Sequence, residues 1–273
     1  METVNSADGT RIAFDRIGAG PVVVIVGGAF SYRRFPLQVD LARRLSDRFE
    51  VVSYDRRGRG DSADGPNYSV DREVEDLAAV IGAVGGSASV WGISSGGALA
   101  LEAVAQGVPI LRLAVYDPPF VVSTRHGLPP ANLIELVEAD LTAGKRDAAV
   151  RTFMTKGMGA PGVAMVFMRL MPAWKRLREV AHTIPYDIRV MGQNLRGEPL
   201  DASHWSAITI PVLVNAGTKN GAARQEAAIA VAEALSNGHL RLLEGQGIAF
   251  SPAVVEQQLR AFLGQQEKGT ADA

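Results

Sequence analysis

A serine flanked by glycines carries the clearest chemical signal in this sequence. Ser94 lies in the segment Gly92-Ile93-Ser94-Ser95-Gly96-Gly97, which follows an apolar run expected to be a strand and begins a run expected to be a helix. Between a strand and a helix, this pattern forms a sharp turn that raises the serine hydroxyl above a sheet. The flanking residues must be small, because a Cβ on either side would clash in so tight a turn. We therefore predict that Ser94 is a nucleophile.

Two backbone segments are candidates to stabilise negative charge beside Ser94. The amide of Ser95 lies at the expected start of a helix, where unpaired N–H groups and the helix dipole favour an anion. The loop after the first long apolar run, Gly27-Gly28-Ala29-Phe30, can direct the amide of Ala29 or Phe30 into the same space. Ala29, Phe30 and Ser95 are therefore the predicted oxyanion hole.

The apolar pattern also predicts the elements that would position this turn. Short strands at Thr3–Ser6 and Thr10–Phe14 flank Asp8-Gly9, a dipeptide that favours a tight hairpin. Further strands are expected at Val22–Val26, Val51–Tyr54, Ala88–Trp91, Leu111–Tyr116, Ile210–Asn215 and Leu240–Leu243. Helices are expected at Leu37–Leu45, Val70–Ile81, Ser95–Ala105, Ala222–Leu235 and Pro252–Leu263. This alternation predicts an α/β fold with a mostly parallel, doubly wound sheet.

The alternation is interrupted after the strand that follows Ser94. Residues 121–205 contain several helical stretches and many prolines, and we predict that they form an inserted helical lid. Residues 1–120 and 206–265 are the expected core, and residues 266–273 a flexible polar tail.

The expected lid is rich in methionine and aromatic side chains. Six of the seven methionines lie there: Met154, Met158, Met165, Met168, Met171 and Met191. Methionine adapts to irregular shapes, so the space between lid and sheet is expected to take a bulky apolar ligand, such as a planar or polycyclic molecule. Any single methionine could instead pack the lid on the core. The predicted pocket residues are Met154, Met158, Met168, Trp174, His182 and Ile248.

Four segments together resemble the α/β-hydrolase superfamily, and in particular a bacterial group of α/β hydrolases. They are Gly27-Gly28-Ala29-Phe30, the run from Tyr54 to Ser62, Gly92-Ile93-Ser94-Ser95-Gly96 and Tyr116-Asp117-Pro118-Pro119-Phe120. The resemblance extends from the first hairpin to the last helix and implies the α/β-hydrolase fold. It implies Asp117 as the triad acid, because some members, such as the haloalkane dehalogenases, carry the acid after this strand. It also implies a structural role for Arg57 and leaves Arg56 unassigned.

The sequence departs from the family pattern at two positions. Asn220, an amide, stands where the acid more usually lies, and Ile248 stands where the family has the triad histidine. Loss of the general base costs triad hydrolases several powers of ten in rate, so ordinary ester hydrolysis is expected to be very slow. A buried Asp117 without a cation would have a raised pKa and could serve as an acid or base itself.

The four histidines provide the other candidate bases. His126 and His182 are the two that could reach the pocket, and they are the candidates for a relocated base. His204 and His239 are expected to be structural.

Composition restricts the possible partners. The net charge of −1 and the pI of about 6.4 indicate neither nucleic acid nor an anionic membrane as a partner, and no apolar run is long enough to span a bilayer. The absence of cysteine excludes disulfides and thiolate metal sites. We expect a cytoplasmic protein that acts on a small molecule without a cofactor or metal, and the oligomeric state stays open.

Three functions are compatible with these residues. The favoured one is cofactor-independent, non-hydrolytic chemistry, such as oxygenation or C–C bond or ring tailoring in secondary metabolism. It follows from the resemblance, since the superfamily includes hydroxynitrile lyases, cofactor-independent oxygenases and natural-product tailoring enzymes. The alternatives are a serine hydrolase with a relocated base and a non-catalytic protein that binds a small molecule.

Overall fold

An eight-stranded sheet forms the centre of the molecule in a computed structural model that describes residues 1–264. Its strands are β1 (Glu2–Asn5), β2 (Arg11–Ile17), β3 (Val22–Val26), β4 (Glu50–Tyr54), β5 (Ala88–Ile93), β6 (Ile110–Tyr116), β7 (Val212–Gly217) and β8 (Gly238–Leu243). The strand order is β1-β2-β4-β3-β5-β6-β7-β8. Only the pairs β1/β2 and β2/β4 among the described strands are antiparallel, which confirms the predicted α/β class with a mostly parallel sheet.

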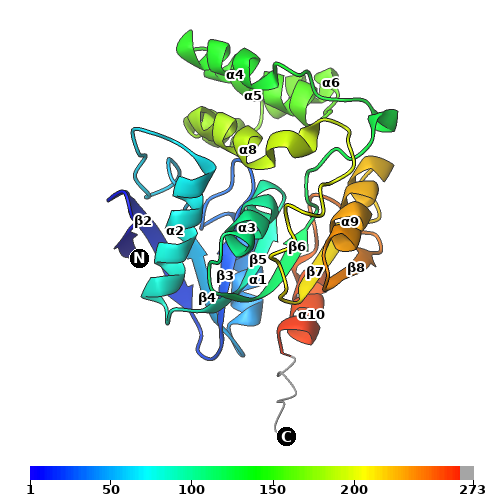
Figure 1. Ribbon diagram of the computed structural model, residues 1–273. Helices are drawn as coiled ribbons and strands as arrows, with labels where there is room; N and C mark the ends of the chain where they lie inside the picture. The colour runs from blue at the N-terminus through cyan, green and yellow to red at the C-terminus, as the bar shows by residue number, and fades with distance from the viewer. Residues whose placement is uncertain (265–273) are drawn as a thin grey trace, which may run out of the picture.

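Helices cover both faces of this sheet, as a doubly wound fold requires (Figure 1). The helices of the core are α1 (Pro36–Leu45), α2 (Val70–Ala83), α3 (Ser95–Ala105), α9 (Ala222–Ala234) and α10 (Pro252–Leu263). Side chains alternate along each strand, so Val24 and Val26 pack with α2, α3 and α9, whereas Val23 and Ile25 pack with α1 and α10. Strands buried on both faces read as continuous apolar runs, which is why the sequence revealed them.

The chain between β6 and β7 forms helices, which we call the helical insertion. It comprises α4 (Leu133–Thr142), α5 (Arg146–Thr152), α6 (Gly162–Met168), α7 (Ala173–Glu179) and α8 (Ile184–Met191), with the short turns η1 (Thr124–His126), η2 (Phe153–Gly157), η3 (Ala181–Thr183) and η4 (Gly192–Leu195). It has its own apolar cluster, and α8 packs against α3 (Figure 1). The helical character predicted for residues 121–205 is therefore present, and its function as a lid stays a prediction.

Two further points concern the C-terminal tail and membrane-spanning helices. The predicted flexible tail, residues 266–273, lies outside the described residues. Among helices of residues 1–264, none combines the length and apolar character needed to cross a bilayer.

Candidate active site

Ser94 occupies the turn between β5 and α3 in a backbone conformation that non-glycine residues rarely adopt. Its φ is 53° and its ψ is −128°, and its N–H donates to the carbonyl of Tyr116 at 2.8 Å. Such conformations cost about 1–3 kcal/mol and persist only where the surroundings enforce them. The flanking glycines provide that enforcement. A Cβ on Gly96 would lie 2.4 Å from the carbonyl oxygen of Val26, and one on Gly92 would lie 2.7 Å from that of Gly96.

The loop after β3 packs directly against Ser94, as the predicted oxyanion hole requires. A Cβ on Gly28 would lie 3.1 Å from the Cβ of Ser94. Ala29 and Ser95 both line the cavity beside Ser94, whereas Phe30, with φ 61°, packs edge-on against Phe153 of the helical insertion, with ring centroids 5.8 Å apart. Ala29 and Ser95 are therefore placed together with the nucleophile, and Phe30 connects their loop to the insertion.

The cavity beside Ser94 is small. Its volume is about 30 Å³, enough for a water molecule but far below the several hundred Å³ of typical ligand pockets. Its lining comprises Ala29, Ser94, Ser95, Pro119, Phe153, Gly157, Met158, Asp187, Met191, Leu195 and Arg224. A substrate must therefore present a small group to Ser94 unless the helical insertion moves.

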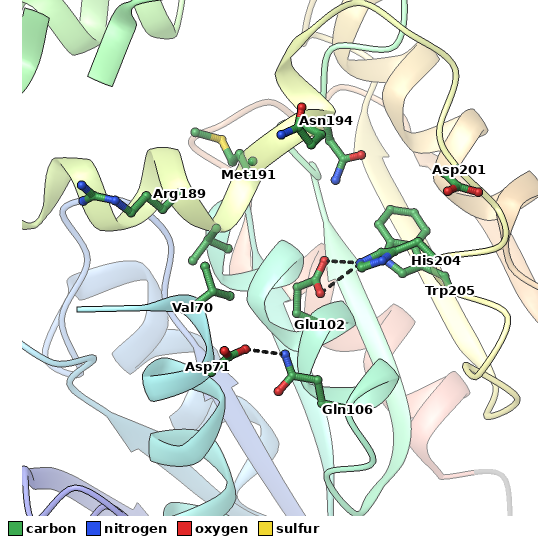
Figure 2. A pocket seen from close by; sticks show the side chains of 13 residues that line it. Val70, Asp71, Glu102, Gln106, Arg189, Met191, Asn194, Asp201, His204 and Trp205 are labelled. Carbon is green, nitrogen blue, oxygen red and sulfur yellow. Dashed lines mark hydrogen bonds and ion pairs between the residues drawn. The ribbon is translucent and has the colours of Figure 1, made fainter. Parts of the chain in front are cut away.

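A larger groove lies elsewhere, between α2, α3 and the end of the helical insertion (Figure 2). It has a volume of about 480 Å³, and none of the predicted site residues lines it. Four of its polar side chains pair with one another, since His204 Nε2 lies 2.9 Å from Glu102 and Gln106 donates to Asp71 at 3.0 Å (Figure 2). The structural role expected for His204 fits this pairing.

Asp117 follows β6 and is buried, with 3 % of its surface exposed. One carboxylate oxygen accepts the N–H of Gly217 at 3.2 Å, and the other accepts a hydrogen bond from the side-chain amide of Asn220. Burial raises the pKa of Asp117 to about 6, despite the lowering effects of Gly217, Arg224 and Asn220. The raised pKa expected from the sequence is therefore found, and its cause is desolvation.

Ile248 differs from the prediction that it forms an apolar pocket wall. Its side chain is 61 % exposed in the loop after β8. The position itself is close to Asn220, the partner of Asp117, because a Cβ on the preceding Gly247 would lie 3.3 Å from the side-chain oxygen of Asn220. An isoleucine side chain offers no proton acceptor.

None of the described histidines lines the cavity beside Ser94. His126 Nε2 lies 3.2 Å from Glu226, and His182 Nε2 lies 3.8 Å from Asp64. His182 therefore lies outside the pocket that was predicted to contain it, and neither relocated base reaches the serine in this structure. Within residues 1–264, no group of three or more histidine, aspartate or glutamate side chains is arranged to hold a metal ion.

The predicted pocket residues of the helical insertion divide into two groups. Met158 lines the cavity as predicted. Met154, Met168 and Trp174 instead pack within the apolar cluster of the insertion, and the indole N–H of Trp174 donates to Asp147 at 2.5 Å. These three differ from the prediction because the insertion needs a core of its own, and the same residue types that suit a pocket also suit that core.

A buried ionic cluster, which the sequence did not reveal, connects the helical insertion to the nucleophile. Asp187 of α8 accepts hydrogen bonds from the Ser95 hydroxyl at 2.7 Å, from Arg56 at 2.8 Å and from Arg59 at 2.7 Å. Arg56 also donates to Glu73 at 2.6 Å. Although burial alone would raise it, Arg59 and Arg56 keep the pKa of Asp187 below its ordinary value. We call Arg56, Arg59, Glu73 and Asp187 the ionic cluster.

The arginines of the ionic cluster also support the loop after β3. Arg56 donates to the carbonyl of Gly27 at 3.3 Å, and Arg59 donates to that of Gly28 at 2.8 Å. Arg57 points elsewhere and pairs with Asp76 at 2.7 Å, in agreement with its expected structural role. The two segments expected to form the oxyanion hole are thus held by one set of buried charges.

Comparisons with known proteins agree with this architecture. Residues 22–254 match the family model described as the alpha/beta hydrolase family. The crystal structure of an alpha/beta hydrolase from Sphaerobacter thermophilus is 44 % identical, with a TM-score of 0.90 over 96 % of this chain and 100 % of that one. An enol-lactonase from Burkholderia xenovorans, 19 % identical with a TM-score of 0.69 over 97 % of this chain and 100 % of that one, shares the fold.

One curated relative is similar over a shorter stretch. N-formylmaleamate deformylase from Pseudomonas putida is 36 % identical over 131 residues. The match covers 45 % of this chain and 47 % of that relative, so it spans about half of its length.

Proposed function

The chain belongs to the alpha/beta hydrolase family, and from that premise we propose that it hydrolyses a small acyl compound with Ser94 as the nucleophile. The observation that carries the proposal is the strained conformation of Ser94 beside a cavity lined by Ala29 and Ser95. The relatives named above are called an alpha/beta hydrolase, an enol-lactonase and a deformylase, which favours hydrolysis over the non-hydrolytic chemistry expected from the sequence.

The proposed reaction has two stages. The Ser94 oxygen attacks the acyl carbon, and the amides of Ser95 and of Ala29 or Phe30 stabilise the oxyanion. The intermediate collapses to an acyl-enzyme as the leaving group departs, and water then releases the acid and restores the serine.

Asp117 is the base in this proposal. The N–H of Ser94 donates to the carbonyl of Tyr116, so the backbone of Asp117 adjoins that of the nucleophile. A carboxylate with a pKa of about 6 is a better proton acceptor at neutral pH than an ordinary aspartate. Asp117 would accept the serine proton directly or through a water molecule.

The absence of a histidine at the cavity restricts the leaving group. A triad histidine normally donates a proton to the departing group. Without it, a group that leaves readily as an anion is favoured, such as an enol, a phenol or the nitrogen of an imide. The small cavity favours a short acyl part of a few carbons.

Intact-mass labelling with a fluorophosphonate tests the proposal, with Ser94→Ala and Ile248→His as variants. We expect a slow single addition to the wild type, none to Ser94→Ala and a faster one to Ile248→His. Hydrolysis of 4-nitrophenyl acetate should follow the same order. If Ser94→Ala hydrolyses this ester as fast as the wild type, and neither wild type nor Ile248→His is labelled, the proposal is wrong.

A further inference from the structure

Arg224 is a partly buried cation whose side chain is not used within the fold. It lies in the first turn of α9 and lines the cavity beside Ser94. Its guanidinium makes no hydrogen bond or ion pair with any side chain or carbonyl of residues 1–264. The fully buried arginines behave differently, because each contacts a carboxylate: Arg33 with Asp15, Arg56 with Glu73, Arg57 with Asp76 and Arg59 with Asp187.

The carboxylates near the cavity are already occupied. Asp187 accepts hydrogen bonds from two arginines and the Ser95 hydroxyl. Asp117 attracts Arg224 through space, but its oxygens accept from Gly217 and Asn220, and no ion pair within 4.0 Å forms. The ionic cluster is neutral in sum, with two arginines and two carboxylates. Both oxygens of Asp117 thus have hydrogen-bond donors, whereas the guanidinium of Arg224 has no acceptor within the described residues.

An unpaired guanidinium is costly to desolvate unless a ligand pairs with it. Burial lowers the pKa of Arg224, with Asp117 acting in the opposite direction, yet an arginine stays protonated in proteins. Its planar fork of N–H donors matches a carboxylate, which it can bind with two parallel hydrogen bonds.

We propose that Arg224 binds a carboxylate of the substrate and thereby positions the acyl carbonyl at Ser94. This inference rests on the proposed function, and it names the substrate class as a short acyl compound with a carboxylate. Because Ser94 and Arg224 line the same 30 Å³ cavity, the carboxylate lies only a few bonds from the carbonyl that is attacked.

A pair of matched esters tests the inference. The probes are 4-nitrophenyl hydrogen fumarate and 4-nitrophenyl methyl fumarate, which differ in one negative charge and whose trans double bond prevents the acid from attacking its own ester. We expect the wild type to have a kcat/KM about 10- to 100-fold higher for the acid, as a charge-assisted hydrogen bond supplies. This ratio should fall towards one in Arg224→Gln and be partly retained in Arg224→Lys. Arg169→Gln, which removes an equally positive but exposed side chain, should keep the wild-type ratio.

Binding of fumarate provides a readout that needs no turnover. At constant ionic strength, fumarate should raise the melting temperature of the wild type and of Arg169→Gln, but not that of Arg224→Gln. If the wild type does not prefer the acid ester, or if Arg224→Gln keeps the preference, the inference is overturned. If no ester is hydrolysed, the shift in melting temperature caused by fumarate is the deciding measurement. A shift that is lost in Arg224→Gln supports the anion site while the proposed hydrolysis fails, and no shift in the wild type overturns the site as well.

Discussion

The nucleophile region and the acid region of this site differ in how completely their groups are paired. At the ends of β3 and β5, four buried charges and a set of close glycine contacts fix Ser94 and both predicted oxyanion segments. At the ends of β6, β7 and β8, a buried Asp117 has amides as partners, and the histidine position is an exposed isoleucine. The first region has the features of a complete hydrolase, and the second does not.

The difference indicates that the two regions can vary independently. The conformation of Ser94 depends on packing between β3, β5 and α3 and on a contact from α8. The acid and base positions lie in loops after other strands, and the Asp117 carboxylate accepts its hydrogen bonds from Gly217 and Asn220, outside this packing. Loss of the histidine therefore leaves the strained serine in place, and the substrate needs a leaving group that departs without being protonated by a histidine.

The largest effect is expected from breaking the ionic cluster with Asp187→Asn. Removing one partner of a buried ion pair leaves uncompensated charges and costs about 3–5 kcal/mol. The free energy of unfolding in urea should fall by this amount, and fluorophosphonate labelling of Ser94 should slow, because Ser95 and the loop after β3 lose their support. Asp47→Asn, which breaks the solvent-exposed pair with Arg260, should change stability far less. Equal unfolding midpoints for the two variants would contradict the role of the ionic cluster.

The effect of Asp117→Asn on stability should have the opposite sign to that of Asp187→Asn, because the ionised carboxylate of Asp117 is buried and destabilises the fold. The pKa of Asp117 is raised from 3.8 to about 6, so the folded chain binds this proton more tightly than the unfolded chain. The contribution to stability is full below pH 4 and is lost as the pH rises through 6. At 1.4 kcal/mol per pKa unit, the ionised group costs roughly 3 kcal/mol at pH 8.

Urea titrations at two pH values measure this cost. Asparagine cannot ionise, so the stability of Asp117→Asn relative to the wild type should rise by about 3 kcal/mol between pH 4 and pH 8. A difference that stays constant over this range would mean that Asp117 is not held in a desolvated state.

Ile248→His tests whether the acid region lacks only a histidine. General-base catalysis typically contributes about a hundredfold or more, so labelling and ester hydrolysis should increase about a hundredfold. The side chain is exposed, so stability should change by less than about 0.5 kcal/mol. Ile248→Gln is the matched control, since glutamine is polar but not basic. An equal gain in both variants would show that the isoleucine merely obstructs the site.

Local patterns made most of the fold predictable. The buried strands read as apolar runs, and the turn at Ser94 needs only nearby glycines, so both could be inferred without knowing distant contacts. The prediction for β7 was displaced, from Ile210–Asn215 to Val212–Gly217. Pro211 has no N–H for the ladder, and Ala216 and Gly217 pair instead with Leu242 and Leu243 of β8.

The partners of the site were not predictable, because they are distant in sequence. Asp187 lies within an amphipathic stretch of α8 and looks like a solvent-facing charge, yet it contacts Ser95 and Arg56. Arg224 lies in an alanine-rich helix and carries no motif. The same limit explains Trp174, since composition alone does not tell whether an apolar side chain faces a pocket or the core of its own insertion.

The smallest effect is expected from relieving the strain at Ser94. Ser94→Gly and Ser94→Ala both remove the hydroxyl, but only glycine adopts φ 53° and ψ −128° without a steric cost. Relief of about 1–3 kcal/mol is offset by the greater freedom of glycine in the unfolded chain, which leaves Ser94→Gly about 1 kcal/mol more stable than Ser94→Ala. Urea unfolding of the two variants measures this difference directly. If Ser94→Gly is instead about 0.5–1 kcal/mol less stable than Ser94→Ala, as glycine is at an unstrained position, the turn imposes no strain on position 94, and the nucleophile region would then be no more specialised than the acid region.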